Sequence, residues 1–331
     1  MGSIRAKISS VGHYIPDHVL SNADLEKMVD TNDEWIRTRT GIRERRILKD
    51  PDKATAFMAV EAAREALQSA NIEAADVDAI IVATVTPDYL FPATAALVQK
   101  RLGAENAFGF DLSAACSGFL YALSTGTMMV ESGRYEKVLV IGADTMSSIT
   151  DYTDRATCIL FGDAAGAVLL EPTGDETGII DFVNHTDGDL DCHLYQRAGG
   201  SLHPASEETV KNRDHCVYQD GRVVFKKATE GMADVSLEIM NKHNLNGDDV
   251  AWLVPHQANK RIIDATARRM GLSDEKVMIN IDKYGNTTAA TIPLCLYDWK
   301  DQLQYGDKLV LSAFGGGYTW GAVYMTWSLN R

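Results

Sequence analysis

Long hydrophobic runs are missing from this sequence. Residues 1 to 7 lead straight into a polar stretch, without the apolar core of about 7–15 residues that marks a secretory signal. No later window stays apolar for the roughly 18 residues that a membrane-spanning helix needs. We therefore expect a protein of the cytoplasm, with no membrane as its partner.

Cysteine is also scarce. The five cysteines are an odd number scattered over 331 residues, and a chain of this length does not need disulfides to stabilise its core. A disulfide framework is therefore not expected, and at least one thiol is available for reaction. The cysteines are Cys116, Cys158, Cys192, Cys216 and Cys295.

Positive charge is in deficit. The chain has 32 lysines and arginines against 46 aspartates and glutamates, which gives a formal net charge of −14. Such a charge repels nucleic acid backbones and anionic membranes, so neither is expected as the main partner. An acidic protein partner would need a local basic patch.

Apolar residues make up 45% of the chain, enough for a large core. Short β-branched runs alternate with longer helical stretches, a pattern typical of an α/β protein with buried sheets. Two duplicated α/β units joined near residues 172–185 would explain why similar pieces recur, although chance similarity between α/β segments is the alternative. In a duplicated protein, equivalent strands of the two halves would end at the interface that the halves share. The recurring pieces are residues 77–84, 107–112, 137–142 and 161–168, which resemble 250–254, 277–281, 308–312 and 314–323.

Cys116 stands among small residues, after the strand-like run 107–112 and before a helical stretch at 120–129. A cysteine at a helix N-terminus faces unpaired backbone N–H groups and the helix dipole, and both favour the nucleophilic thiolate. The small neighbours leave room for a substrate to approach. A buried cysteine acting as a small apolar residue is the alternative, so Cys116 needs partners.

Two polar side chains follow strand-like runs in the second half. His256 comes after the run 250–254 and before a helical stretch at 260–270, and Asn286 follows the run 277–281 beside Gly285. Side chains at such loops project into the cleft where strand ends meet. Taken alone, the histidine is equally compatible with a structural role, and the asparagine with a turn.

A glycine-rich loop at residues 314–317 lies between two strand-like runs near the end of the chain. Glycines let backbone N–H groups approach a bound carbonyl oxygen closely, as an oxyanion hole requires. A tight turn alone is the alternative. The chain thus offers a thiol, a base and an amide at strand-to-helix loops, together with a loop able to hold an oxyanion.

These motifs resemble the β-ketoacyl-acyl-carrier-protein synthase III family, the initiating condensing enzymes of bacterial fatty acid synthesis, over essentially the whole chain. Elongating ketosynthases of this fold combine a cysteine with two histidines, and thiolases carry a second catalytic cysteine near the C-terminal glycines. This chain has Asn286 and the glycines 315–317 at those places. The segments that carry the resemblance are residues 33–36, 39–46, 114–119, 161–163, 255–259, 285–287 and 314–317.

The resemblance implies a thiolase-like fold of the α/β class, in which two duplicated halves form a five-layered α-β-α-β-α core. Residues 1–177 would form the N-terminal half, which carries the nucleophilic cysteine. Residues 178–331 would form the C-terminal half, which carries the histidine and the asparagine.

The resemblance also implies a decarboxylative Claisen condensation. An acyl-CoA would acylate Cys116, with the backbone N–H groups of Cys116 and Gly316 as the oxyanion hole. His256 and Asn286 would then bind the thioester carbonyl of malonyl-acyl-carrier protein while CO₂ leaves and the carbanion attacks the acyl group. The products would be β-ketoacyl-carrier protein and CoA. No metal or redox cofactor is implied, because acyl-CoA is a substrate.

Three residues match family positions that bind CoA. Trp35 and Arg155 match a pair that sandwiches the adenine, and Arg39 matches a residue near the nucleotide phosphates. Planar indole and guanidinium faces suit a purine. For Trp35, simple core packing is the alternative.

Two further surfaces follow from the resemblance. Lys260, Arg261 and Arg268 crowd one helical stretch, where Arg261 matches a residue that docks the carrier protein. A solvated helix face is the alternative. Phe91 matches a residue that crosses a dimer interface to floor the partner's acyl pocket, so a homodimer is expected.

Other interpretations stay open. The enzyme could pass its acyl group to an acceptor of a specialised pathway, or the chain could be a non-catalytic acyl-CoA-binding protein. A zinc site is disfavoured because the adjacent Cys-His pairs lack ligand spacing. Residues 184–223 have little periodicity, so we expect a long surface excursion, which could reshape the mouth of the acyl pocket. The zinc candidates are Cys192, His193, His203, His215 and Cys216.

Overall fold

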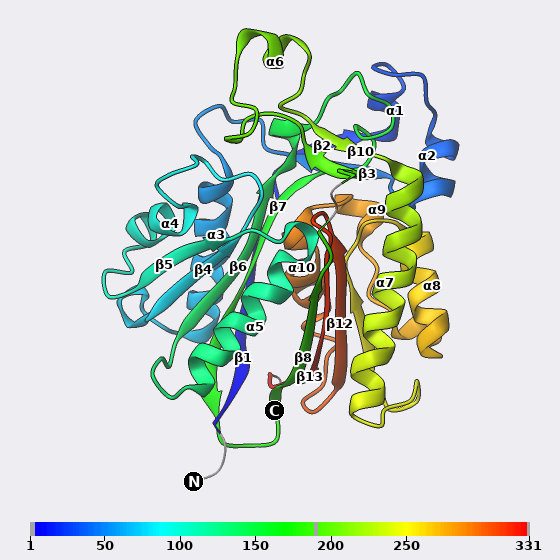
Figure 1. Cartoon of the computed structure of the whole chain (residues 1–331). Helices are drawn as coiled ribbons and strands as arrows, with labels where there is room; N and C mark the ends of the chain where they lie inside the picture. Colours follow the sequence, from blue (N-terminus) through cyan, green and yellow to red (C-terminus); the bar gives the residue numbers. More distant parts are fainter. Residues whose placement is uncertain (1–3, 189–190, 330–331) are drawn as a thin grey trace.

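The computed structural model describes residues 4–188 and 191–329. Two sheets stand side by side in it, each built from one part of the chain (Figure 1). The first sheet has the order β1-β7-β6-β4-β5 and the second β11-β12-β13-β8. The strands are β1 (Arg5–Tyr14), β4 (Ala79–Ala83), β5 (Phe108–Leu112), β6 (Val138–Thr145), β7 (Asp163–Thr173), β8 (Gly178–Thr186), β11 (Trp252–Pro255), β12 (Lys308–Gly315) and β13 (Thr319–Thr326).

The two sheets repeat one topology. In the first, β1 and β6 are antiparallel to β7, and β4 runs parallel to β6. In the second, β8 and β12 are antiparallel to β13, and β11 runs parallel to β12. This repeated order favours the predicted duplication over chance similarity. The boundary between residues 177 and 178 stays a prediction, and it falls between β7 and β8.

The predicted strand at residues 277–281 is wrong. Only an isolated bridge joins Val277 to Leu253, although β5 is a full strand at the matching place in the first sheet. The buried side chain of Gln257 accepts hydrogen bonds from the backbone N–H groups of Asn280 and Ile281, both at 3.2 Å. These bonds turn the chain into the short helix α9 (Ile281–Tyr284) instead of extending it.

Helices form three layers around the sheets. Helices α3 (Thr55–Ala70) and α4 (Thr94–Leu102) cover the outer face of the first sheet, and α7 (Gly221–Lys242) and α8 (Lys260–Met270) cover that of the second. Helices α5 (Gly118–Glu131) and α10 (Thr291–Trp299) lie between the sheets. The predicted α-β-α-β-α order of layers is therefore confirmed.

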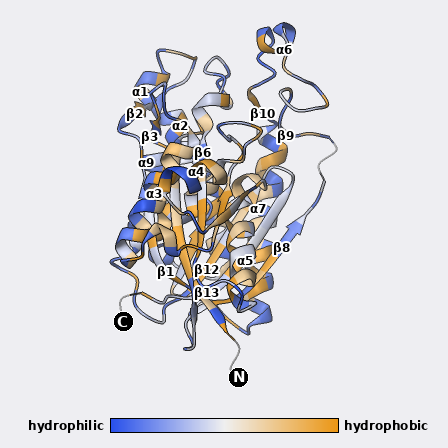
Figure 2. Cartoon of the chain, turned by 90° about the vertical axis from the view of Figure 1, so that its left-hand side faces the viewer, coloured by the Kyte–Doolittle hydropathy of each residue, from blue (hydrophilic) through white to orange (hydrophobic). Residues whose placement is uncertain are grey.

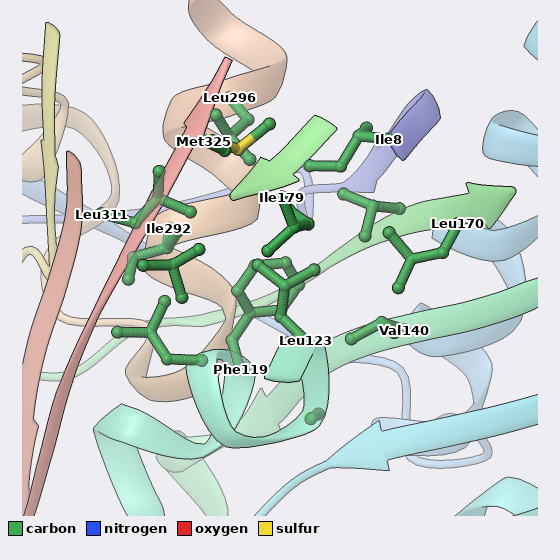
Figure 3. Packing of buried hydrophobic residues seen from close by; sticks show 14 of the residues in the cluster. Ile8, Phe119, Leu123, Val140, Leu170, Ile179, Ile292, Leu296, Leu311 and Met325 are labelled. Atoms are coloured by element: carbon green, nitrogen blue, oxygen red, sulfur yellow. The ribbon is translucent and has the colours of Figure 1, made fainter. Parts of the chain in front are cut away.

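The middle layer forms the main core. Phe119 and Leu123 of α5 are fully buried between Val140 of the first sheet and Leu311 of the second (Figure 3). Figure 2 shows the hydrophobic colouring gathered on the central strands. Because the first residues of α5 and α10 lie at the same end of this layer as the site described below, the core fixes where those helices begin.

Most of the small elements lie at that end of the sheets (Figure 1). Ser21 and Asp24 form a capping box at α1, Asn32 caps α2, and Gly41 ends α2 with a φ of 88°. Among the described residues, no helix is both long and apolar enough to cross a membrane. The small elements are α1 (Asn22–Leu25), α2 (Asp33–Thr40), α6 (Glu207–Lys211), the strand pairs β2 (His18–Ser21) with β3 (Glu44–Ile47) and β9 (Leu194–Gln196) with β10 (Val217–Gln219), and the 3₁₀ turns η1 (Ala74–Asp76), η2 (Ala115–Ser117), η3 (Met146–Ile149), η4 (Asp274–Lys276) and η5 (Thr288–Ala290).

Candidate active site

A pocket of about 800 Å³ is lined by residues of both parts of the chain. Cys116, His256 and Asn286 all line it and are all buried. The structure therefore brings together the three residues that were predicted to carry the chemistry. Other lining residues include Ala114, Met146, Phe161, Thr288, Phe314 and Gly316.

Cys116 lies in the 3₁₀ turn η2, directly before α5. The turn is tied to β13 on both sides of the cysteine. Ser117 Oγ donates to the Thr319 carbonyl at 2.9 Å, and Thr319 Oγ1 donates to the Ala114 carbonyl at 2.8 Å. A Cβ on Gly315 would lie 2.7 Å from the Cys116 nitrogen, so this glycine lets the C-terminal loop pass against the nucleophile.

The helix N-terminus does not decide the acidity of Cys116. Burial raises the pKa of its thiol to about 12, the negative charge of Asp144 adds to this, and hydrogen bonds from its own backbone N–H and from Asn286 act in the opposite direction. The expectation that helix position favours a resting thiolate is therefore wrong. Loss of water around sulfur outweighs the two hydrogen bonds that favour the thiolate, and the resting group is a thiol.

His256 follows β11, and its backbone N–H donates to the Ser312 carbonyl at 2.8 Å. Its Nδ1 lies 2.7 Å from Thr291 Oγ1, and its Nε2 is buried without a hydrogen-bond partner among the described residues. Burial lowers the pKa of the imidazole to about 3. The ring is therefore neutral at physiological pH, with Nε2 available to a bound substrate.

Asn286 is fixed at both its backbone and its side chain. Its N–H donates to the Leu160 carbonyl at 2.9 Å, and its carbonyl accepts from the Gly162 N–H at 3.0 Å. Its Oδ1 accepts from the Thr288 N–H at 2.9 Å. Because Oδ1 is bound in this way, the Nδ2 amide protons remain for Cys116 and for a ligand in the pocket.

A buried carboxylate behind the site was not predicted. Asp144 is the second-last residue of β6 and is fully buried. Hydroxyl and N–H groups from both parts of the chain donate hydrogen bonds to its carboxylate. Burial raises the pKa of this carboxyl above its usual range, and the hydrogen bonds from the donors offset only part of that rise. Asp144 follows an apolar strand in the sequence, as functional acids often do, but nothing local indicates its partners. The donors are Thr84 Oγ1 (3.0 Å), Val85 N (2.8 Å), Thr86 N (3.2 Å), Thr86 Oγ1 (2.9 Å), Ala289 N (3.3 Å) and Thr288 Oγ1.

The three predicted CoA-binding residues gather at the pocket's outer end. The guanidinium carbons of Arg39 and Arg155 each lie 4.9 Å from the centre of the Trp35 indole ring. Arg155 also lies 3.6 Å from the Asp30 carboxylate at an exposed position. Trp35 and Arg39 line the pocket, whereas Arg155 reaches it only through its contact with the indole.

The predicted basic residues lie on α8 beside the same pocket. Arg261 lines the pocket and lies 4.9 Å from the centre of the Phe225 ring. Lys260 pairs with Asp264 at 2.8 Å, one turn further along α8. Arg268 is exposed in the last turn of that helix.

The excursion at residues 184–223 is more than a surface loop. Strands β9 and β10 pair within it, and Leu194, Tyr195 and Val217 line the pocket. Figure 1 shows α6 projecting beyond the ends of both sheets. Arg213 pairs with Asp151, which ties the excursion to the segment after η3. Within residues 4–188 and 191–329, no three metal-ligating side chains gather at one point.

Phe91 lies outside this pocket. Its side chain is 87% exposed, and its neighbours Tyr89 and Leu90 are exposed as well. The segment leads into α4, whose first N–H groups are held by Asp111 of the edge strand β5. The start of α4, three residues after Phe91, is thus attached to β5, the last strand of the first sheet among the described residues.

Comparisons with known proteins identify the family of this chain. Residues 110–188 match the family model described as 3-Oxoacyl-[acyl-carrier-protein (ACP)] synthase III, and residues 240–327 match the model of its C-terminal part. The Beta-ketoacyl-[acyl-carrier-protein] synthase III of Chlorobium chlorochromatii is 58% identical over 328 residues, which cover 98% of this chain and 100% of the relative. The chain belongs to this family.

Two further similarities extend over nearly the whole of this chain. The Porphyromonas gingivalis synthase III is 54% identical over 330 residues, covering 100% of this chain and 98% of the relative. The crystal structure of 3-oxoacyl-[acyl-carrier-protein] synthase III from Aquifex aeolicus has a TM-score of 0.89 and 44% identity, over 97% of this chain and 100% of that one. The predicted thiolase-like fold and condensing acyltransferase class are confirmed.

The pKa of Cys116 predicts how the thiol reacts with iodoacetamide. A thiol whose pKa is about 12 gains thiolate by about tenfold per pH unit, so the alkylation rate at Cys116 should rise in that way from about pH 7 to about pH 10. Peptide mass spectrometry measures the rate at this site, with the exposed Cys192 as the control in the same sample. A plateau below about pH 9 would show that the thiolate forms far more easily than burial allows.

Proposed function

We propose that this synthase III condenses an acyl-CoA starter with malonyl-acyl-carrier protein and so initiates fatty acid synthesis. The observation that carries the proposal is that Cys116 from one part of the chain and His256 and Asn286 from the other line a single pocket. A simple transfer of the acyl group to a hydroxyl or amine has no decarboxylation to assist. Such a transfer would therefore have little use for the complete set of Cys116, His256 and Asn286.

In the first step, Cys116 Sγ attacks the thioester carbon of the acyl-CoA. The carbonyl oxygen gains negative charge in the tetrahedral intermediate, and the backbone N–H groups of Cys116 and Gly316 stabilise it. This role is supported by the contact between the glycine loop and the turn of Cys116. The bond to the CoA sulfur then breaks, CoA leaves, and an acyl-Cys116 thioester remains.

In the second step, the malonyl thioester carbonyl receives hydrogen bonds from His256 Nε2 and Asn286 Nδ2. Loss of CO₂ places negative charge on that carbonyl oxygen, where fixed donors in a dry pocket stabilise the enolate. The enolate carbon attacks the acyl-Cys116 carbon, and the bond from that carbon to Sγ breaks. The released thiolate takes a proton from water and returns to the resting thiol. The orientation of Asn286 supports this role because Oδ1 is already bound by Thr288.

The CoA nucleotide would bind at the outer end of the pocket. The adenine would stack on the Trp35 indole, with Arg155 on its other face and Arg39 near the phosphates. In the structure Arg155 already lies against the indole, so it has to move off the ring before a purine can enter. The ion pair between Arg155 and the exposed Asp30 is a weak restraint on this movement.

The carrier protein would dock beside this opening. Lys260, Arg261 and Arg268 on α8 provide local positive charge on a chain whose formal net charge is −14. An acidic carrier would thus be drawn to α8, beside the pocket that holds Cys116. We place this reaction in the cytoplasm.

The proposed assembly is a homodimer that pairs along β5. This strand is the edge of the first sheet, and its Phe108 is partly exposed. Since β5 ends at Leu112, four residues before Cys116, a copy that paired there would bring its own Phe91 close to this chain's nucleophile. Phe91 would then floor the partner's acyl pocket.

Separate half-reactions test the residue roles. Cys116→Ala should take up no acyl group from any acyl-CoA, because the nucleophile is gone. Asn286→Ala should still be acylated, and His256→Ala should be acylated more slowly because Nε2 no longer takes the thiol proton. Both variants should form β-ketoacyl-carrier protein at least about 100-fold more slowly. Intact-protein mass spectrometry measures the adduct and the product, with Cys192→Ala as the control that keeps both activities.

The remaining outcomes separate the alternative functions. Acylation of the wild type without condensation onto malonyl-acyl-carrier protein would favour an acyltransferase of a specialised pathway. A wild type that binds acyl-CoA but is never acylated would be a binding protein. A panel of acyl-CoA starters in the same assay would identify the preferred acyl group.

The dimer is tested by mass and by starter range. Light scattering should give twice the chain mass of 36.2 kDa. Phe91→Trp should leave that mass unchanged but lower kcat/KM for branched starters by about tenfold, because the larger ring shortens the partner's pocket. The exposed neighbour substitution Leu90→Trp is the control. A monomer, or an unchanged starter range in Phe91→Trp, would contradict the proposed interface.

A further inference from the structure

The ring of His256 has one bound nitrogen and one unbound nitrogen. Nδ1 lies 2.7 Å from Thr291 Oγ1, whereas Nε2 is buried and has no partner among the residues that the structure describes. Only 1% of the residue is exposed, so water cannot easily compensate for a wrongly placed proton. The tautomer of the ring therefore depends on what Thr291 offers to Nδ1.

Thr291 has a single hydroxyl proton to give. Its Oγ1 lies 3.1 Å from the Thr288 carbonyl, which can only accept. If Nδ1 carries the ring proton, Nδ1–H donates to Thr291 and Thr291 donates to Thr288, so all three groups are satisfied. If Nε2 carries it, Thr291 must turn toward Nδ1, and the Thr288 carbonyl loses this bond. The resting arrangement with the proton on Nδ1 thus has one hydrogen bond more.

Thr288 is held firmly enough to impose this preference. Its hydroxyl donates to the buried carboxylate of Asp144, and its φ of 49° places it in the left-handed region, which a β-branched residue rarely adopts. Its N–H donates to Asn286 Oδ1 at 2.9 Å. One anchored residue therefore supports Asn286 directly and His256 through Thr291.

We propose that Thr291, anchored by Thr288 and Asp144, is a positioning residue that fixes the ring orientation and the tautomer of His256. This inference rests on the proposed function, in which His256 acts on the substrate. It explains why a hydroxyl stands behind the ring: a hydroxyl can accept from Nδ1 and can also donate to it, whereas a carboxylate or a carbonyl can only accept.

The proton balance of acylation follows from the resting tautomer. The unprotonated Nε2 takes the proton of Cys116 Sγ as sulfur bonds to the acyl carbon. When the bond between that carbon and the CoA sulfur breaks, the leaving sulfur takes the proton from Nε2, so CoA departs as a thiol. His256 returns to its starting state, and Thr291 accepts from Nδ1 throughout.

Condensation needs the other state of the ring. Nε2 must carry a proton to donate to the malonyl thioester carbonyl, so Nδ1 must give one up. Water that enters the vacated pocket after CoA has left gives Nε2 a proton and takes up the proton of Nδ1 in exchange, and the Thr291 hydroxyl then turns to donate to Nδ1. The malonyl thioester displaces this water when it binds. The Thr291 side chain thus supports both acylation and condensation. During condensation it no longer donates to the Thr288 carbonyl.

Nitrogen NMR of the ring tests the inference directly. In the wild-type enzyme labelled with ¹⁵N-histidine, His256 should show a protonated Nδ1 and an unprotonated Nε2, with the signal assigned by its loss in His256→Gln. A wild-type spectrum with the proton on Nε2 would overturn the inference. The spectrum reports the tautomer of His256 whether or not the enzyme condenses its substrates. A failure of the proposed function would therefore not be mistaken for a failure of this inference.

Substitution of Thr291 provides the matching kinetic test. Thr291→Val should disturb the tautomer and slow both acylation and malonyl decarboxylation by about tenfold, and Thr291→Ser should restore both. The control is Thr266→Val, which removes another buried helical hydroxyl, one that donates to the Ile262 carbonyl on α8. An unchanged tautomer with unchanged rates in Thr291→Val would overturn the inference. If that variant fails to fold, the wild-type spectrum still decides.

Discussion

The buried carboxylate of Asp144 is the interaction on which the rest of the site depends. Its Oδ1 accepts hydrogen bonds from residues 84–86 of the first part of the chain, and its Oδ2 accepts from residues 288 and 289 of the second. A carboxylate without water is costly unless many donors surround it, so this group holds both parts in one arrangement. That arrangement makes Cys116, from one part, face His256 and Asn286, from the other.

The same charge shapes the reactivity of the site. Asp144 and the lack of water keep Cys116 as a thiol, and burial keeps His256 neutral, so the resting pocket holds no ion pair between them. A pocket of this kind is suited to a reaction in which negative charge appears only briefly, on a thioester oxygen that fixed N–H groups already face. Charge then develops on the substrate instead of being stored on the enzyme.

Much of this could be predicted from the sequence, because a strand followed by small residues and a helix has a local signature. Helix α8 has the predicted bounds, and Cys116 directly precedes α5 as predicted. Contacts between distant residues leave no such signature. The bond between Thr288 and Asp144 joins positions 144 residues apart, and the Gln257 side chain turns residues 277–281 away from a strand. The excursion was underestimated because its two strands have only three residues each, too few for a visible alternation.

Isotope tracing tests the central claim most directly, namely that the pocket joins two acyl units with loss of CO₂. The enzyme would receive an acyl-CoA labelled in its acyl carbonyl and malonyl-acyl-carrier protein labelled in its free carboxylate. We expect the acyl label at the β-keto carbon of the product and the malonyl label entirely in released CO₂. An acyl label recovered on an acceptor that keeps its malonyl carboxylate, or no labelled product at all, would contradict the account.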